Sequence, residues 1–314
     1  MLTAKDLIPA ALEAGFSAAA LTDASPTDPM PDGVHAQARK LISDPREILP
    51  GARSILVCAL GYEPYAPSPG EAAVDAYYVA GNRAHAMADD LARRIGQCGV
   101  RAVLTSALRT KPLAARSGLG HVGRNGLLAV GRWGTRITLQ VIVTDIPFDS
   151  GARVSEPWLD SACAECGLCV AACPTQALRG DGSLDVEKCV RAQSETLPLP
   201  EYMRPMTGNS VLGCDLCQRV CPRNAGVKDA PVPEHVAELL RLSRLLNGDY
   251  KGLREVLGSN NARRTRLLSR AVLAAANEGR RDLVDALEAL TTEPPPLGEH
   301  AAWALKRLRG EQDV

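Results

Sequence analysis

The hydrophobic and polar positions of the first 150 residues form short apolar runs separated by longer amphipathic segments. This pattern is typical of strands and helices built around one sheet. The predicted strands are β-prone runs bounded by glycine, proline or charge: Phe16–Thr22, Ser54–Leu60, Val100–Ser106, Gly126–Val130 and Ile137–Asp145. The predicted helices are Thr3–Ala14, which opens with a capping-box-like Thr-x-x-Asp, and Ala72–Gln97, in which Gly81 is a candidate interruption. We expect an α/β or α+β domain with a single sheet over residues 1–154.

The pattern changes twice in the rest of the chain. Residues 155–233 are rich in cysteine, proline and glycine, as expected where bound metal stabilises a segment too small for its own core. From Glu234 onward the pattern is helical, over 234–247, 249–257, 262–277, 281–291 and 298–309. Helix pairs of this length favour a small HEAT-like stack over residues 234–314, although no sequence period repeats cleanly. The expected fold class is α+β, with three domains.

Composition narrows the class of protein. The chain has 314 residues, 46% hydrophobic and 23% charged, as in globular proteins with a substantial core. Its 36 basic and 36 acidic residues cancel and it has only two Phe, so the bulk numbers predict no general nucleic-acid-binding surface. We see no signal peptide and no apolar run long enough to cross a bilayer. We expect a cytoplasmic protein without membrane contact.

Eight of the ten cysteines lie between Cys163 and Cys221. Cys58 and Cys98 stand alone in apolar or helical surroundings, where a cysteine is ordinarily a small buried hydrophobic residue. The first motif, Cys163-Ala-Glu-Cys166-Gly-Leu-Cys169-Val-Ala-Ala-Cys173-Pro174, is the C-x2-C-x2-C-x3-C-P run of two-cluster ferredoxins. The second set is Cys189 followed by Cys214-Asp-Leu-Cys217-Gln-Arg-Val-Cys221-Pro222.

In such a run three cysteines bind one [4Fe–4S] cluster and the fourth binds the other. Reciprocity assigns one cluster to Cys163, Cys166, Cys169 and Cys221, and the other to Cys173, Cys189, Cys214 and Cys217. The gap before Cys214 is longer than in compact ferredoxins, and this departure falls on Cys189. Structural zinc and disulfides are the alternatives, but neither calls for a trailing x3-C-P after both sets. The sequence therefore predicts a ferredoxin-like domain with two [4Fe–4S] clusters that relay electrons.

Stretches outside the cysteines carry a further pattern. They are Leu49–Ser54 ahead of the strand Ile55–Leu60, the glycine-rich run Ser117–Leu128, Gly208-Asn209 ahead of Gly213–Cys217, and Arg270–Asn277 followed by His300–Leu305. Together they resemble the epoxyqueuosine reductase family, and the resemblance covers essentially the whole chain in order. It implies a cobalamin-dependent reductase with two clusters, related in its cofactor domain and clusters to the reductive dehalogenases.

The resemblance implies that the N-terminal domain binds the corrinoid, whose cobalt the clusters reduce. The candidate corrinoid-binding residues lie in the glycine-rich run: Gly118, Gly120, Arg124, Asn125 and Gly126. A glycine-rich turn lets the backbone approach a large flat ring closely, and the two polar side chains suit the amides of a corrin. The alternative is that these glycines only make a turn at the entry to a strand.

One segment departs from the family pattern. The family carries an aspartate, taken to be the general acid, ahead of the glycine-rich run, whereas Leu104–Lys111 contains no carboxylate and His121 replaces the usual Trp. Reductive cleavage of a C–O bond requires a proton at the leaving oxygen. Tyr78 and His121 are the candidate catalytic donors, with Tyr77 as a further tyrosine. For each of them the alternative is an ordinary core or surface role.

The resemblance also implies partners. Arg263, Arg264, Arg266 and Arg270 form a basic run in the region with which the family holds tRNA; a solvated helix face paired with acids is the alternative. A protein such as ferredoxin or flavodoxin would supply electrons. The predicted function is a reductase of the epoxyqueuosine reductase type, in queuosine modification of tRNA, with the substrate open. The rival is an electron-transfer or corrinoid-activating protein without turnover of its own, which the missing aspartate favours.

Overall fold

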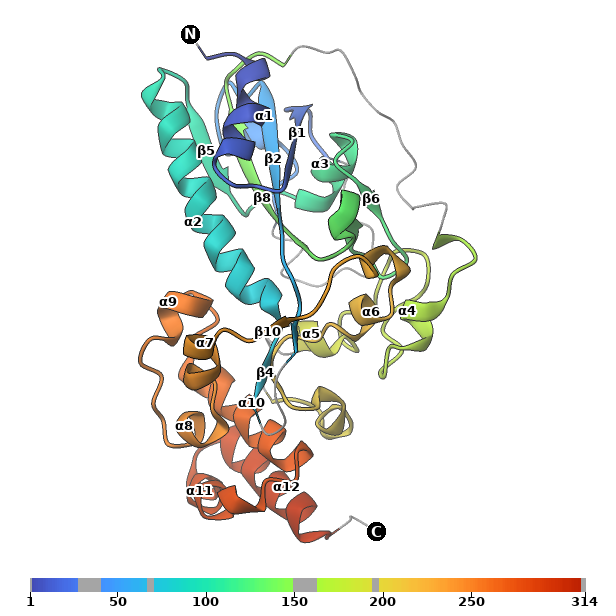
Figure 1. The fold of residues 1–314 in the computed structure, drawn as a ribbon, viewed down its shortest axis with the longest axis vertical. Coiled ribbons are helices and arrows are strands. Elements are labelled where there is room, and N and C mark those ends of the chain that lie inside the picture. The colour runs from blue at the N-terminus through green and yellow to red at the C-terminus, as the bar shows by residue number, and fades with distance from the viewer. Residues whose placement is uncertain (1, 28–40, 67–70, 149–162, 194–197, 312–314) are drawn as a thin grey trace.

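The computed structural model describes residues 2–27, 41–66, 71–148, 163–193 and 198–311. Figure 1 shows the chain passing from a sheet with flanking helices, through a segment of short helices and loops, to a group of helices at the C-terminus. The expected boundary between residues 154 and 155 lies outside the described residues. Within the described ranges, no helix is long and apolar enough to cross a membrane.

The central sheet has four strands in the order β1-β2-β8-β5. They are β1 (Ala18–Asp23), β2 (Ser54–Gly61), β8 (Ile137–Thr144) and β5 (Ala102–Thr105). Every neighbouring pair is antiparallel, so of the two classes that the pattern left open the domain is α+β. The remaining predicted strand is shortened to β7 (Leu128–Ala129), which pairs with β6 (His121–Val122) in a hairpin outside this sheet.

Strand β2 is buried on both faces because helices cover the sheet on each side. The even-numbered residues of Ile55–Leu60 join a core formed with α1 (Ala4–Glu13) and α2 (Ala76–Gln97). The odd-numbered residues join a second core that includes α3 (Thr110–Arg116). Cys58 is fully buried, as expected, and burial raises the pKa of its thiol to about 12. Cys98 is exposed at the C-terminal end of α2, so the expectation of a buried residue was wrong there.

The two long N-terminal helices begin at side-chain caps. In α1 the Asp6 carboxylate accepts a hydrogen bond from the Thr3 backbone N–H at 2.8 Å, as the Thr-x-x-Asp pattern predicts. Helix α2 runs unbroken through Gly81 and begins after Asp75, whose carboxylate accepts from the Tyr77 N–H at 3.0 Å. It starts later than predicted because the residues before Asp75 form β4 (Ala73–Val74).

Two small parallel ladders tie the N-terminal domain to the cysteine segment. Strand β4 pairs with β9 (Ser210–Leu212), and β3 (Tyr65–Ala66) pairs with β10 (Ala230–Pro231). The helices of the cysteine segment are single turns: α4 (Leu168–Ala171), α5 (Val190–Gln193) and α6 (Leu216–Arg219). Short 3₁₀ turns occur at Pro45–Glu47, Gly131–Trp133, Glu201–Met203, Pro205–Thr207, Pro222–Asn224, Arg281–Leu283 and Leu290–Thr292.

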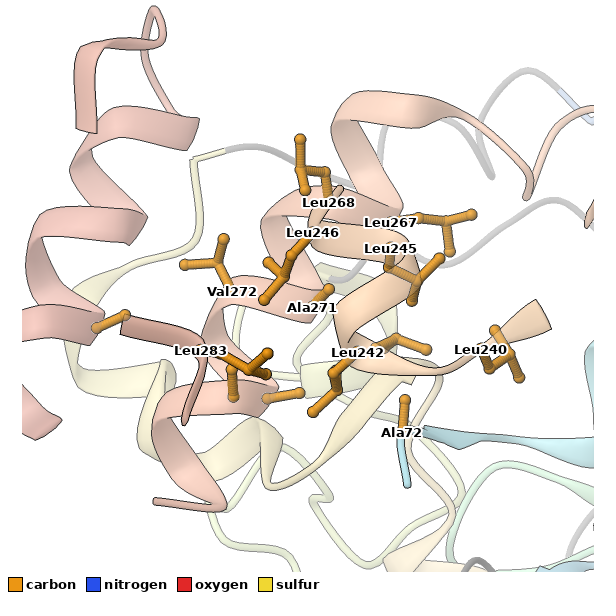
Figure 2. Close-up of a cluster of buried hydrophobic side chains, with 14 of the residues drawn as sticks. Ala72, Leu240, Leu242, Leu245, Leu246, Leu267, Leu268, Ala271, Val272 and Leu283 are labelled. Carbon is orange, nitrogen blue, oxygen red and sulfur yellow. The ribbon is translucent and has the colours of Figure 1, made fainter. Parts of the chain in front are cut away.

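The C-terminal helices pack around a core of leucine and alanine (Figure 2). They are α7 (Glu234–Leu239), α8 (Leu242–Leu246), α9 (Leu253–Leu257), α10 (Arg264–Asn277), α11 (Val284–Ala289) and α12 (Leu297–Arg309). The predicted helix 234–247 is thus two helices. Every residue of α10 from 267 to 276 is buried, so this helix is the centre of the group. Ala72, just before β4, reaches into the same core (Figure 2).

A buried polar junction also holds the N-terminal domain to the cysteine segment. The Asn224 Oδ1 accepts from the Thr135 N–H at 2.8 Å, and the Gln218 amide donates to the Thr135 carbonyl at 2.7 Å. Arg136 is 2% exposed and donates to the carboxylate of Asp215 at 2.9 Å. Buried polar groups are stable only when they are paired, so this network fixes how the two parts meet.

Gly134 provides a test of this junction. Its φ is 50°, and a Cβ there would overlap the carbonyl oxygen of Arg223 and the amide of Asn224. Gly131 has a similar φ of 46°, but a Cβ there would meet no other atom within 4 Å among the described residues. We expect Gly134→Ala to lower the free energy of unfolding by about 2 kcal/mol more than Gly131→Ala, because only the first disturbs the junction. Thermal unfolding of both variants measures the difference, and equal losses would contradict the prediction.

Candidate functional site

Four of the eight clustered cysteines surround one cavity. Cys163, Cys166, Cys169 and Cys221 all line a hollow of about 210 Å³. Burial raises the pKa of the Cys221 thiol, and the neighbouring Cys163 and Cys166 raise it further. Helices α4 and α6, which carry or precede these residues, pack on each other. The set that reciprocity assigned to one cluster therefore converges in space, although Cys221 lies far from the other three in the sequence.

The other four cysteines form a second set, and all of them are half-buried: Cys173, Cys189, Cys214 and Cys217. Burial raises the pKa of Cys214 to about 11 and that of Cys217 to about 12, and Cys189 adds to both increases. Cys189, on which the spacing departs from compact ferredoxins, therefore lies among the other members of its set.

The donor chemistry of both sets fits iron–sulfur clusters. Thiolates are the soft ligands that such clusters require, and four are available on each side. Raised pKa values keep free thiols protonated, so binding of metal must release those protons. Which cysteine binds which cluster stays a prediction, and the two groupings agree with it.

The glycines of the run Ser117–Leu128 make contacts within the chain. A Cβ on Gly120 would overlap the carbonyl oxygen of Ala129, across the β6–β7 hairpin. Gly126 has a φ of 71°, and a Cβ there would lie 2.9 Å from the carbonyl oxygen of Gly182. Gly118 also has a positive φ, of 72°. Turn geometry and packing thus account for these three glycines, which is the alternative that the sequence left open.

The two polar side chains of this run also have partners in the chain. The Arg124 guanidinium donates to the carbonyl oxygens of Gly180 at 2.7 Å, Ala164 at 3.1 Å and Cys166 at 3.0 Å. Asn125 is 4% exposed, and its Oδ1 accepts from the Leu127 N–H at 3.1 Å. Arg124 therefore holds the loops around the first cysteine set. Corrinoid binding by these five residues stays a prediction that rests on the family resemblance.

The two predicted catalytic residues lie on different elements. His121 is half-buried in β6, opposite Ala129. Tyr78 is 5% exposed on α2, where its ring is edge-to-face with that of Tyr77 at 5.5 Å. A role of either residue as proton donor stays a prediction.

Tyr78 belongs to a buried polar group that the sequence did not reveal. The guanidinium carbon of Arg191 lies 4.2 Å from the centre of the Tyr77 ring and 5.7 Å from that of Tyr78. Asp75 lies alongside, and burial raises the pKa of its carboxyl. The electrostatic influence of Asp75 reaches Cys214, so this group borders the second cysteine set. The available signals were weak: Asp75 lies within a predicted helix, and Arg191 follows Cys189 by two residues.

The segment Leu104–Lys111, which lacks the family's aspartate, connects β5 to α3. It leaves β5, forms a bridge between Leu108 and Ile42, and enters α3 with Lys111. The Lys111 amine donates a hydrogen bond to the carbonyl oxygen of Gly126. Burial and, to a smaller extent, Arg191 lower the pKa of Lys111, Cys189 and Cys217 raise it, and the net result is a pKa of about 8. The segment therefore brings an amine, rather than a carboxylate, toward the second cysteine set.

The basic run of α10 divides into exposed and buried residues. Arg263 and Arg264 are exposed, and Arg264 pairs with Glu293 at 3.4 Å. Arg270 is only 2% exposed and lies in the core of the helical group. Neither predicted role, contact with tRNA or a solvated face, suits Arg270, because α10 is buried throughout residues 267–276.

Known proteins are similar to this chain over nearly its whole length. Residues 162–224 match the family of 4Fe-4S double cluster binding domains, so this segment is a two-cluster domain. The epoxyqueuosine reductase of Staphylococcus aureus is 28% identical over 98% of this chain and 89% of its own length. That of Escherichia coli is 26% identical over 83% and 74%, and that of a Synechococcus strain is 35% identical over 58% and 59%.

Solved structures show the same fold. An epoxyqueuosine reductase from Bacillus subtilis, with its catalytic aspartate loop swung out of the active site, superposes with a TM-score of 0.79 at 24% identity, over 97% of this chain and 90% of that one. An epoxyqueuosine reductase with an epoxyqueuosine-modified tRNA-Tyr stem loop gives 0.80 at 24% identity, over 97% and 89%. A catabolic reductive dehalogenase gives 0.51 at 19% identity, over 83% and 37%.

Removal of Cys189 tests the grouping of the cysteines. We expect anaerobically purified protein to hold about eight iron and eight sulfide per chain, and Cys189→Ala to hold about four of each, because one of two clusters loses a ligand. Cys98→Ala is the matched control and should keep all the iron, since that thiol is exposed at the end of α2. Iron and sulfide analysis measures both. Stoichiometric zinc, or unchanged iron in Cys189→Ala, would contradict the assignment.

Proposed function

Because this chain is a relative of the epoxyqueuosine reductases over nearly its whole length, we propose that it is an iron–sulfur and cobalamin-dependent reductase of that type. The observation that carries the proposal is the pair of four-cysteine sets, gathered in a fold that matches those enzymes over 97% of the chain. The match includes the C-terminal helices. A protein that only transferred electrons would need the clusters but not this helical group, which favours the reductase over its rival.

The surface near the first cysteine set suits an electron donor. Leu168 and Val220 are exposed large hydrophobic residues, with 52% and 39% of their surface accessible. Each is next to a cysteine in the chain. A protein such as ferredoxin or flavodoxin would bury these side chains on docking, which brings its redox centre close to the first set. Electrons would then pass from the first cluster to the second.

The N-terminal domain is the proposed site of the corrinoid. When bound, cobalamin would supply a cobalt centre that accepts electrons and reacts with the substrate. The residues of this chain that the family resemblance assigns to it are Gly118, Gly120, Arg124, Asn125 and Gly126. Since Arg124 also holds the loops of the first cysteine set, its contacts would link the corrinoid site to the cluster domain.

The substrate class follows from the relatives. One solved epoxyqueuosine reductase holds a modified tRNA stem loop, and we propose tRNA as the partner of this chain. The exposed Arg263 and Arg264 are available for its phosphates, whereas Arg270 is buried. The proton donor is proposed to be Tyr78 or His121. Asp75, beside Tyr78, adds a half-buried carboxyl, and burial raises its pKa.

Cobalamin binding separates the reductase from its rival. We expect the reconstituted protein to bind added cobalamin with its lower base displaced, because the fold is that of cobalamin-dependent relatives. The absorption spectrum reports this state, and the clusters and the corrinoid absorb differently. The same protein without clusters is the control for any influence of the iron–sulfur domain. No spectral change and no calorimetric affinity in the intact holo-protein would contradict a corrinoid site.

Turnover of tRNA-linked epoxyqueuosine tests the substrate. We expect it to be slow or absent, because Leu104–Lys111 offers no carboxylate and loss of a general acid typically costs about a hundred- to ten-thousand-fold in rate. Reconstituted protein is incubated with epoxyqueuosine-containing tRNA and a low-potential reductant, and queuosine is quantified by mass spectrometry. The Bacillus subtilis relative serves as the reference. A matching rate would show that the missing aspartate does not matter, and binding without turnover would indicate a different substrate.

A further inference from the structure

Three cationic side chains approach the second cysteine set from separate parts of the chain. Lys111 comes from the start of α3, Arg191 from α5 and Arg270 from α10. They are far apart in sequence, and only Arg191 is close to a cysteine along the chain. Their convergence is a property of the tertiary structure.

Lys111 and Arg191 lie on the side of Cys189 and Cys217. The Lys111 amine is anchored on the Gly126 carbonyl oxygen, and its charge is coupled to those of Cys189, Cys217 and Arg191. The Arg191 guanidinium is fixed over the ring of Tyr77 at 4.2 Å. An arginine guanidinium is not deprotonated in proteins, so Arg191 is a permanent positive charge.

Arg270 lies on the side of Cys214. It is 2% exposed, and its Nε and one terminal nitrogen have no hydrogen-bond partner within the part of the chain that the structure describes. Burial and Arg266 lower the pKa of Arg270, Tyr78 and Cys214 raise it, and the net result is a pKa of about 10. Helix α10 packs on β9, which leads into Gly213 and Cys214, so the placement agrees with the backbone. A buried guanidinium without a partner is unfavourable unless a nearby anion compensates its charge.

The negative groups nearby do not cancel these charges. Asp75 borders the same set, but it is one carboxyl beside three cations, so even when it is ionised a net positive charge remains. Asp215 forms salt bridges with Arg136 at 2.9 Å and with Arg219 at 3.0 Å. An iron–sulfur cluster with four thiolates is a net anion, and it becomes more negative when it is reduced. It is therefore the partner that the three cations fit.

The first cysteine set has different surroundings. The Arg124 guanidinium beside it donates its hydrogen bonds to three carbonyl oxygens. Arg223, whose charge lowers the pKa of the Cys221 thiol, is exposed to solvent, and water screens that charge. Arg124 keeps its positive charge in these contacts, but it is one half-buried cation, against three around the second set, of which Arg270 is fully buried.

We propose that Lys111, Arg191 and Arg270 raise the reduction potential of the second cluster above that of the first. Positive charge in a low-dielectric setting stabilises the reduced, more negative cluster, and net charge and solvent exposure are levers that set cluster potentials. One electron from the docked reductant then passes from the first cluster, which is reoxidised, to the second, which is reduced. This inference rests on the two clusters of the proposed function.

A redox titration of the anaerobic holo-protein, followed by EPR, tests the proposal. In Arg270→Met, and separately in Lys111→Met, we expect the ratio of reduced to oxidised second cluster at a fixed potential to fall roughly tenfold, a shift of about 59 mV for one electron. In each variant the first cluster should keep the reduction potential that it has in the unmodified protein. Arg270→Lys and Lys111→Arg preserve the charge and should restore most of the loss, which a merely structural role would not predict.

The outcomes separate this inference from the proposed function. Two clusters with potentials that do not respond to either methionine variant would overturn the tuning role and leave the reductase proposal standing. Equal shifts in both clusters would also overturn it, because they would indicate a general change in the fold. Protein without two clusters would remove both proposals together. Lys111→Met, at a half-buried position, keeps the test decisive if Arg270→Met does not fold.

Discussion

Three parts of the chain meet at the second cysteine set, and this meeting is the constraint on which the rest of the structure depends. Gly213, the residue before Cys214, has a φ of 91°, and a Cβ there would lie 2.6 Å from the Asp75 Cβ and 2.9 Å from the Tyr78 ring. Only glycine lets the cysteine segment pass this close to the start of α2. On the opposite side, Cys214 packs against the core cluster that includes Leu273 of α10. Ligand placement therefore requires all three parts to be folded together.

This constraint explains why the domains are so closely joined. The β4–β9 ladder, the contact of α10 with β9 and the junction of Arg136 with Asp215 all converge on the segment that carries Cys214 and Cys217. Ala72 packs into the C-terminal core although it belongs to the N-terminal part of the chain. The neighbouring parts of the chain thus supply the core against which the segment with Cys214 packs.

The glycine-rich run shows how one set of residues can support two interpretations. Its glycines permit a tight hairpin and a close approach to Gly182, and its arginine binds the carbonyl oxygens of the cluster loops. The same run carries the resemblance to corrinoid enzymes. Structural and cofactor roles are compatible, because a loop that is fixed on one side by the clusters presents a rigid backbone on the other. The absence of a carboxylate from Leu104–Lys111 is the point at which this sequence departs from the family that it resembles.

The sequence by itself predicted most of the elements and the two groups of cysteines. Apolar runs predicted β2 and β8 almost to the residue, and the spacing of Cys163 to Cys173 identified a two-cluster domain, because local periodicity and local ligand loops are encoded by neighbouring residues. It did not reveal that Arg270 is buried, that Cys98 is exposed or that β4 precedes α2. Those outcomes depend on which distant segment covers a residue. Only the tertiary structure brought Lys111, Arg191 and Arg270 around one cysteine set, since burial and charge proximity arise from contacts between residues far apart in the chain.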